Sequence, residues 1–172
     1  MIPEEVEIDM PHATLGLATL AVVLTSTSLC AAAPWKTDKF DTGVIVSYTA
    51  TQSDAAEEYY LVVQCIVPGK WNIFVESPID WDDSASYAPD VPATFGIDGI
   101  EISDVAFIFD DRSFTEGIVA YAKGQELPFE ALRDALASAS STINLGYFDK
   151  RTSFSSEGST AAIQYVKDSC GG

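Results

Sequence analysis

The sequence predicts an α+β fold that is mostly β: a small antiparallel β-sandwich with two helices. Residues 59–76, YYLVVQCIVPGKWNIFVE, contain two runs of β-branched and aromatic residues around Pro68-Gly69, the pattern of a β-hairpin. Further short strand-like runs follow, and helical periodicity occurs in two stretches near the C-terminus. Cys65 and Cys170 both fall at core-facing positions, so we expect a disulfide that ties the C-terminal helix to a central strand.

The other predicted strands are short and bounded by polar turns. They are residues 44–51, 93–97, 100–103, 105–109, 118–122, 142–148 and 152–156. Asp98-Gly99 is typical of a two-residue hairpin turn. Both faces of the 59–76 hairpin are fairly apolar, so we expect it at the centre of the fold with at least one face covered. Residues 35–40 are expected to be a lead-in, with Trp35 as a candidate anchor.

Two helices are predicted from apolar residues that recur at helical spacing. Residues 128–138 begin with proline, which suits a first helical turn. Their buried face comprises Phe129, Leu132 and Leu136. Residues 159–169 begin with Ser159, which can cap the N-terminus of a helix. The buried stripe of this second helix comprises Ala162, Ile163, Val166 and Cys170.

The N-terminal segment has the pattern of a secretory signal peptide. Residues 15–24, LGLATLAVVL, form an apolar run, and small residues follow a short polar stretch. We therefore expect residues 1–33 to be a signal peptide, with cleavage after Ala31 or Ala32. Because the residues before Met10 are acidic, Met10 is the expected true start.

Two alternatives for this segment stay open. Residues 13–33 could be a retained membrane anchor, or Cys30 could be the lipidated cysteine of a lipoprotein. With a cleaved signal peptide, the protein would meet the membrane only transiently. Residues 34–172 would then form one globular β-sandwich domain in the periplasm or outside the cell.

The charge balance excludes some partners. The chain has 9 Lys and Arg against 26 Asp and Glu, a formal net charge of −17. Nucleic acid is not an expected partner, because phosphate binding needs clustered Lys and Arg. An anionic membrane surface is disfavoured for the same reason. A basic protein partner in the cell envelope, or a divalent cation, is compatible with this charge.

The scarcity of histidine also restricts the catalytic and metal-binding chemistry that the chain could perform. The one histidine, His12, lies in the expected signal peptide. A mature chain without histidine excludes Ser-His-Asp and Cys-His catalysis, as well as His-ligated zinc, copper and haem. It would retain Cys65 and Cys170, and an even number of cysteines in an exported chain favours a disulfide. We expect no catalytic residues and no cofactor.

Residues 77–92, SPIDWDDSASYAPDVP, are predicted to be a long acidic loop that contacts a partner. The candidate interaction residues are Asp80, Trp81, Asp82, Asp83 and Tyr87. Several carboxylates on a loop also suggest calcium, but the spacing departs from an EF-hand. Ala85 stands where glycine is needed, and Val91 where a bidentate glutamate is needed. We therefore expect a solvated loop without a metal, with an irregular calcium site as the alternative.

The C-terminal pattern F-x-x-x-G-S-x-x-A-I-x-x-V-x-x-x-C comprises Phe154, Gly158, Ser159, Ala162, Ile163, Val166 and Cys170. With the signal peptide, LVVQC before a Trp-containing hairpin, and FGIDG, it resembles a loose group of bacterial periplasmic proteins. The group includes the invasion-associated locus B family and type VI secretion-associated accessory lipoproteins. The resemblance covers most of residues 35–170. It implies a small β-sandwich with a disulfide from its C-terminal helix to a central strand, and no catalytic residues.

We therefore expect a non-enzymatic exported protein of the bacterial cell envelope that acts by binding, with a protein as its partner. One alternative is an acidic inhibitor or immunity protein that blocks a cationic hydrolase. A second is a carboxylate-based hydrolase, for which Asp110, Asp111 and Glu116 would be the candidate acids.

Overall fold

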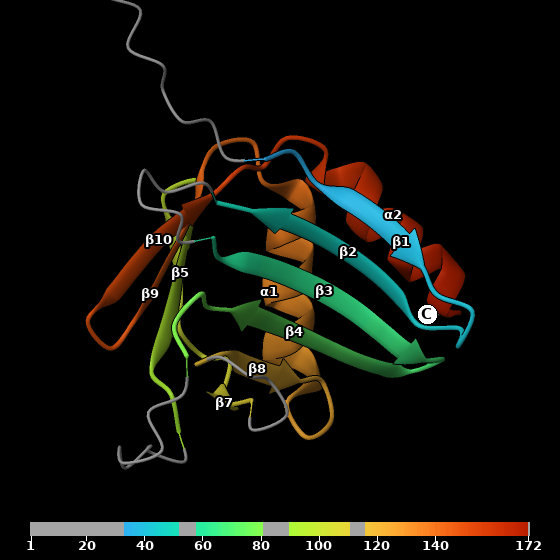
Figure 1. The fold of residues 1–172 in the computed structure, drawn as a ribbon, viewed down its shortest axis with the longest axis horizontal. Helices are drawn as coiled ribbons and strands as arrows, with labels where there is room; N and C mark the ends of the chain where they lie inside the picture. The colour runs from blue at the N-terminus through green and yellow to red at the C-terminus, as the bar shows by residue number, and fades with distance from the viewer. Residues whose placement is uncertain (1–32, 52–57, 81–89, 111–115, 172) are drawn as a thin grey trace, which may run out of the picture.

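The structure is a computed structural model that describes residues 33–51, 58–80, 90–110 and 116–171. In these ranges two antiparallel sheets and two helices form the mostly β fold that the sequence predicts (Figure 1). The elements are β1 Lys36–Lys39, β2 Ile45–Ala50, β3 Tyr60–Val67, β4 Lys70–Glu76, β5 Ala93–Ile97, β6 Ile100–Ile102, β7 Ile108–Phe109, β8 Ile118–Tyr121, α1 Glu126–Ser138, β9 Ile143–Tyr147, β10 Lys150–Phe154 and α2 Ser159–Cys170. No helix in the described ranges is long and apolar enough to cross a membrane.

The six-stranded sheet has the order β1-β2-β3-β4-β8-β7, which places the predicted hairpin at its centre. β3 and β4 pair across the turn, with Leu61 opposite Val75 and Val63 opposite Ile73. Alternation along each strand turns these four side chains toward the same face, where none is exposed to solvent. α1 runs behind this sheet and α2 lies along β1 and β2 (Figure 1). The central hairpin is therefore covered on one face, as predicted.

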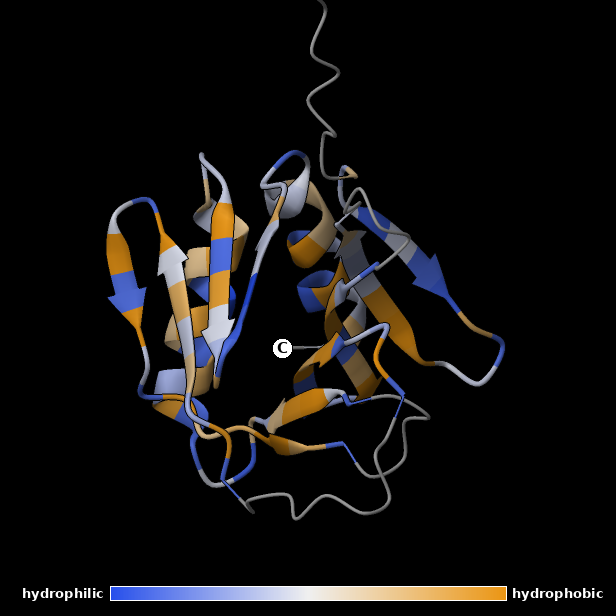
Figure 2. Cartoon of the chain, turned by 60° about the vertical axis from the view of Figure 1, so that its left-hand side comes forward, coloured by the Kyte–Doolittle hydropathy of each residue, from blue (hydrophilic) through white to orange (hydrophobic). Residues whose placement is uncertain are grey.

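The four-stranded sheet has the order β10-β9-β5-β6. Its inward-facing side chains, among them Phe95 and Leu145, belong to the same core as Leu132 of α1 and Ile163 of α2. Apolar and polar residues alternate along its strands, as Figure 2 shows by colour. One face of this sheet is therefore buried against the core and the other faces solvent.

The predicted disulfide is present between Cys65 of β3 and Cys170 of α2. The two Cα atoms are 6.0 Å apart, and each residue is 1% exposed. Cys65 lies in register between Ile45 and Trp71, on the face that α2 covers. The period of two in β3 and the helical stripe of α2 thus bring both sulfur atoms into the core.

The structure corrects the expectation for residues 35–40. Residues 36–39 are not a lead-in but an edge strand, β1, which pairs antiparallel with β2 from Lys36 opposite Tyr48 to Lys39 opposite Ile45. All four side chains of β1 are exposed. Because no face of this strand is buried, its sequence lacks the alternation that identifies a strand.

Other details differ from the prediction, among them the start of α1, which is Glu126 rather than residue 128. In residues 105–109 only Ile108 and Phe109 form a strand. β10 begins at Lys150 rather than residue 152, because the turn is at Phe148 and residue 149. Ser159 does not cap α2: the cap position is Gly158, whose φ of 81° is left-handed, and the Ser159 hydroxyl is buried without a hydrogen-bond partner.

The predicted Asp98-Gly99 turn connects β5 and β6 and is also attached to the end of α1. Both turn residues have positive φ, 50° and 81°, as a two-residue hairpin turn requires. The Asp98 carboxylate accepts hydrogen bonds from the backbone N–H groups of Ser140 and Ser141, each at 2.9 Å, and from the Ser141 hydroxyl at 2.6 Å. The bonds from Ser141 and then Ser140 lower the pKa of Asp98.

Asp98→Asn is expected to lower stability near neutral pH and to lose this effect in acid. A carboxyl group whose pKa is lowered by folding stabilises the protein above its unfolded pKa, and that contribution disappears as the pH falls through the folded pKa. Asparagine tolerates positive φ, so the substitution removes the charge and leaves the turn conformation accessible. Urea unfolding of both proteins at about pH 7 and at about pH 3 measures the difference. An Asp98→Asn effect of equal size at both pH values would contradict this role.

Candidate binding site on the four-stranded sheet

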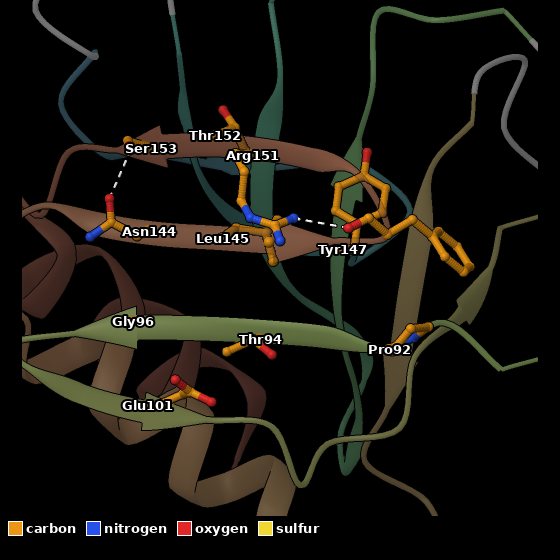
Figure 3. A pocket seen from close by; sticks show the side chains of 12 residues that line it. Pro92, Thr94, Gly96, Glu101, Asn144, Leu145, Tyr147, Arg151, Thr152 and Ser153 are labelled. Atoms are coloured by element: carbon orange, nitrogen blue, oxygen red, sulfur yellow. Dashed lines mark hydrogen bonds between the residues drawn. The ribbon is translucent and has the colours of Figure 1, made fainter.

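The outer face of the four-stranded sheet is built from small and polar residues. Along each strand they alternate with core residues such as Phe95 and Leu145. The outer-face residues are Thr94, Gly96, Glu101, Asn144, Gly146, Arg151 and Ser153. With their neighbours they line an open depression of about 660 Å³, which we call the sheet depression (Figure 3).

Strand register arranges these residues in two rows across the sheet. In the first row Ser153 lies opposite Asn144, Asn144 opposite Gly96, and Gly96 opposite Glu101. The Ser153 hydroxyl donates a hydrogen bond of 2.8 Å to the Asn144 side-chain oxygen. The depression therefore offers amide, hydroxyl and carboxylate groups along one line of the sheet (Figure 3).

Arg151, Gly146 and Thr94 form the second row. The Arg151 side chain lies over Gly146: a Cβ atom at residue 146 would be 3.1 Å from Nε and 3.2 Å from Cζ. Arg151 Nη1 donates hydrogen bonds to the carbonyls of Phe148, at 3.0 Å, and Lys150, at 2.6 Å. Glycine at 146 thus allows the guanidinium to lie flat on the sheet, where two carbonyl groups hold it.

Gly96 keeps the floor of the depression open. Its φ is not in the left-handed region, so its backbone conformation does not require glycine. Among the residues that the structure describes, a Cβ atom there would contact Asn144 Cβ, at an ordinary 3.7 Å. Glycine inside a strand weakens it and often marks a place where a ligand or another backbone comes close. Because neither conformation nor space requires glycine here, its effect is to leave the floor without a side chain.

Phe148 forms an apolar wall at one end of the depression. It is 45% exposed, and its φ of 48° is unusual for a bulky residue. Its ring stacks on Phe109 of β7, with ring centroids 5.8 Å apart and an interplanar angle of 13°. The β9–β10 turn is therefore held against the six-stranded sheet, next to the carbonyl group that holds Arg151.

Most of the predicted interaction loop lies outside the described residues. Trp81, Asp82, Asp83 and Tyr87 are in the undescribed range 81–89. Asp80 is described and exposed. The described residues contain no cluster of His, Cys, Asp and Glu that could hold a metal ion.

Of the carboxylates considered for a hydrolase, Asp111 lies outside the described residues. Asp110 and Glu116 lie on neighbouring segments, since the Asp110 N–H donates to the Gly117 carbonyl at 2.9 Å. Glu116 forms an ion pair with Lys150, with Oε2 and Nζ 2.9 Å apart and side chains only 15% and 21% exposed. Burial is the largest single effect and lowers the pKa of Lys150, but the hydrogen bond to Glu116 and the nearby negative charges, chiefly that of Glu116, together raise it by more, and the net shift is upward. This ion pair joins the β9–β10 turn to the segment before β8.

Comparisons with protein-family models, curated proteins and solved structures gave no match to this chain. The resemblance to periplasmic proteins therefore stays a prediction.

Proposed function

We propose that this protein is a non-enzymatic, extracytoplasmic binding protein and that the sheet depression is its binding surface. The observation that carries the proposal is the combination of an open floor at Gly96 with a fixed guanidinium at Arg151. Ligand sites are concave, largely pre-formed and equipped with a few well-placed polar groups. The sheet depression has these properties.

An extracytoplasmic location is favoured by the disulfide. Cys65 and Cys170 are bonded to each other, and structural disulfides persist in oxidising compartments such as the bacterial periplasm. The apolar residues 15–24 followed by small residues favour export by a signal peptide. The resemblance to periplasmic proteins agrees with a place in the bacterial cell envelope.

Binding is favoured over catalysis by the chemistry of the depression. Its titratable outer-face residues are Glu101 and Arg151, which stand at opposite edges of the sheet. Acid–base hydrolysis by carboxyl groups needs two of them close to the reacting bond. The remaining polar groups of the outer face, on Thr94, Asn144 and Ser153, are hydrogen-bonding groups suited to recognition.

Filling the floor of the depression tests the proposal. Gly96→Val is expected to leave stability unchanged or slightly raised, because valine favours strands and its Cβ has room. It is expected to abolish ligand binding. A thermal-shift screen of peptides, sugars and organic acids on the wild-type protein first identifies ligands, since a ligand at 100 times its Kd stabilises by about 2.7 kcal/mol. The same ligands are then tested on Gly96→Val.

The matched control is Thr37→Val, an exposed strand position on β1 at the far edge of the other sheet. It should bind every ligand as the wild type does. The proposal fails if no compound in the screen stabilises the wild-type protein. It also fails if Gly96→Val binds the ligands as tightly as Thr37→Val does.

A further inference from the structure

We infer that the sheet depression captures the free C-terminal carboxylate of a short extended peptide, with Arg151 as the carboxylate-binding residue. This inference rests on the proposed function and names the ligand of that same site. It follows from the bonding of Arg151, from the charge of the chain and from the spacing of polar groups across the sheet.

The bonding of Arg151 leaves a carboxylate-binding edge available. Nη1 is occupied by the carbonyl groups of Phe148 and Lys150. Nε and Nη2 form the opposite edge of the guanidinium and have no hydrogen-bond partner among the described residues. Two parallel N–H groups on one edge match the two oxygens of a carboxylate. Arg151 also has no ion pair with an acidic side chain in the described part of the chain.

The charge of the protein favours a ligand with a single negative group. A chain of net charge −17 repels polyanions, so a fixed cation on its surface suits a monoanion better than a nucleic acid or a polyphosphate. Arg151 lies flat over Gly146 and is held in place before a ligand arrives. Little side-chain entropy is therefore lost on binding, which favours affinity.

The spacing across the sheet favours a peptide. Arg151 is on β10 and Glu101 on β6, three strand spacings apart and in different rows, so their Cα atoms are separated by roughly 16 Å. Four residues of extended chain cover about 14 Å, and the side chain of a terminal lysine covers the rest. Glu101 is exposed and negative, so it suits a cationic group at the other end of the ligand, either an amino terminus or a lysine side chain.

The groups between the two charges suit a peptide backbone. Asn144 and Thr94 stand on the neighbouring strands β9 and β5, and their amide and hydroxyl groups can both donate and accept hydrogen bonds. The open floor at Gly96 permits the close approach of a backbone. Phe148, beside the Arg151 site, offers an apolar contact for the last side chain of the peptide.

The test is calorimetric titration with the tetrapeptide Lys-Ala-Ala-Leu and with the same peptide carrying a C-terminal amide. The free acid is expected to bind at least about tenfold more tightly than the amide, since amidation removes a charge-assisted bidentate contact. Arg151→Gln is expected to weaken binding of the free acid by about the same factor and to erase the difference between the two peptides. Lys36→Gln, the matched loss of an exposed strand cation on β1, should leave both affinities unchanged.

Three results would overturn the inference: equal binding of the acid and the amide, no binding of either peptide, or an Arg151→Gln variant that still prefers the acid. A uronic-acid trisaccharide has the carboxylate but no cation, and binding of this sugar without binding of the peptide would also overturn it. A failure of this peptide-binding inference can be distinguished from a failure of the proposed binding function. If other compounds from the thermal-shift screen bind the wild type but not Gly96→Val, the depression is still a binding site and only the ligand class is wrong.

Discussion

Replacing Cys65 and Cys170 together by alanine is expected to lower the free energy of unfolding by about 4–5 kcal/mol. The disulfide joins residues separated by 105 positions, and a cross-link of that span removes much of the conformational freedom of the unfolded chain. The disulfide also links α2 to the central strand β3, and both cysteine residues are buried in the core. Urea unfolding under oxidising conditions, followed by circular dichroism, gives the difference.

Reduced wild-type protein is the control for the double alanine variant. It retains both sulfur atoms and lacks the bond, so it separates the loss of the cross-link from the loss of side-chain volume. We expect reduced wild type to lose most of the same stability. A double variant within about 1 kcal/mol of the oxidised wild type would contradict the structural role of the bond.

Trp35→Ala is expected to lower the free energy of unfolding by about 3–5 kcal/mol, the usual range for truncating a large buried aromatic side chain. Trp35 is 7% exposed and belongs to the core cluster. Its backbone N–H donates to the Glu157 carbonyl at 2.9 Å, and its indole Nε1 donates to the Ser155 carbonyl at 2.7 Å. It thus joins the start of β1 to the connection between β10 and α2. Chemical denaturation of the purified variant measures the loss.

Trp35→Phe separates the packing of the ring from the indole hydrogen bond. Phenylalanine keeps an aromatic ring in the core but leaves the Ser155 carbonyl without its donor, so a smaller loss of about 1–3 kcal/mol is expected. Equal losses for the alanine and phenylalanine variants would show that the hydrogen bond, and not the packing, carries the effect. A loss below about 0.5 kcal/mol for Trp35→Ala would contradict the anchoring role.

The elements that the sequence predicts correctly depend on local patterns. Alternation in residues 59–76 identifies the central hairpin, and the helical spacing of Leu132 and Leu136 identifies the buried face of α1. The Asp98-Gly99 turn and the disulfide follow from residue types at particular positions. β1 could not be predicted from the sequence, because backbone pairing with β2 holds it in place and none of its side chains is buried.

The sheet depression could not be derived from the sequence, because its rows depend on pairing between distant strands. Gly96 meets Asn144 only because β5 pairs with β9, which lies beyond α1 in the chain. Arg151 meets Gly146 only if the turn is at Phe148 and residue 149. The one local signal was glycine inside two strand-like runs, at positions 96 and 146. The charges and aromatic residues of the acidic loop 77–92 are adjacent in sequence, so a sequence pattern alone can indicate that loop.

Amide chemical-shift mapping during titration with a ligand from the thermal-shift screen tests the central claim most directly. The claim is that the outer face of the four-stranded sheet is the binding surface. The largest perturbations are expected at Thr94, Gly96, Asn144, Gly146 and Arg151, with little change along β1 and β2. Perturbations centred on the six-stranded sheet, with Gly96 and Gly146 unchanged, would contradict it.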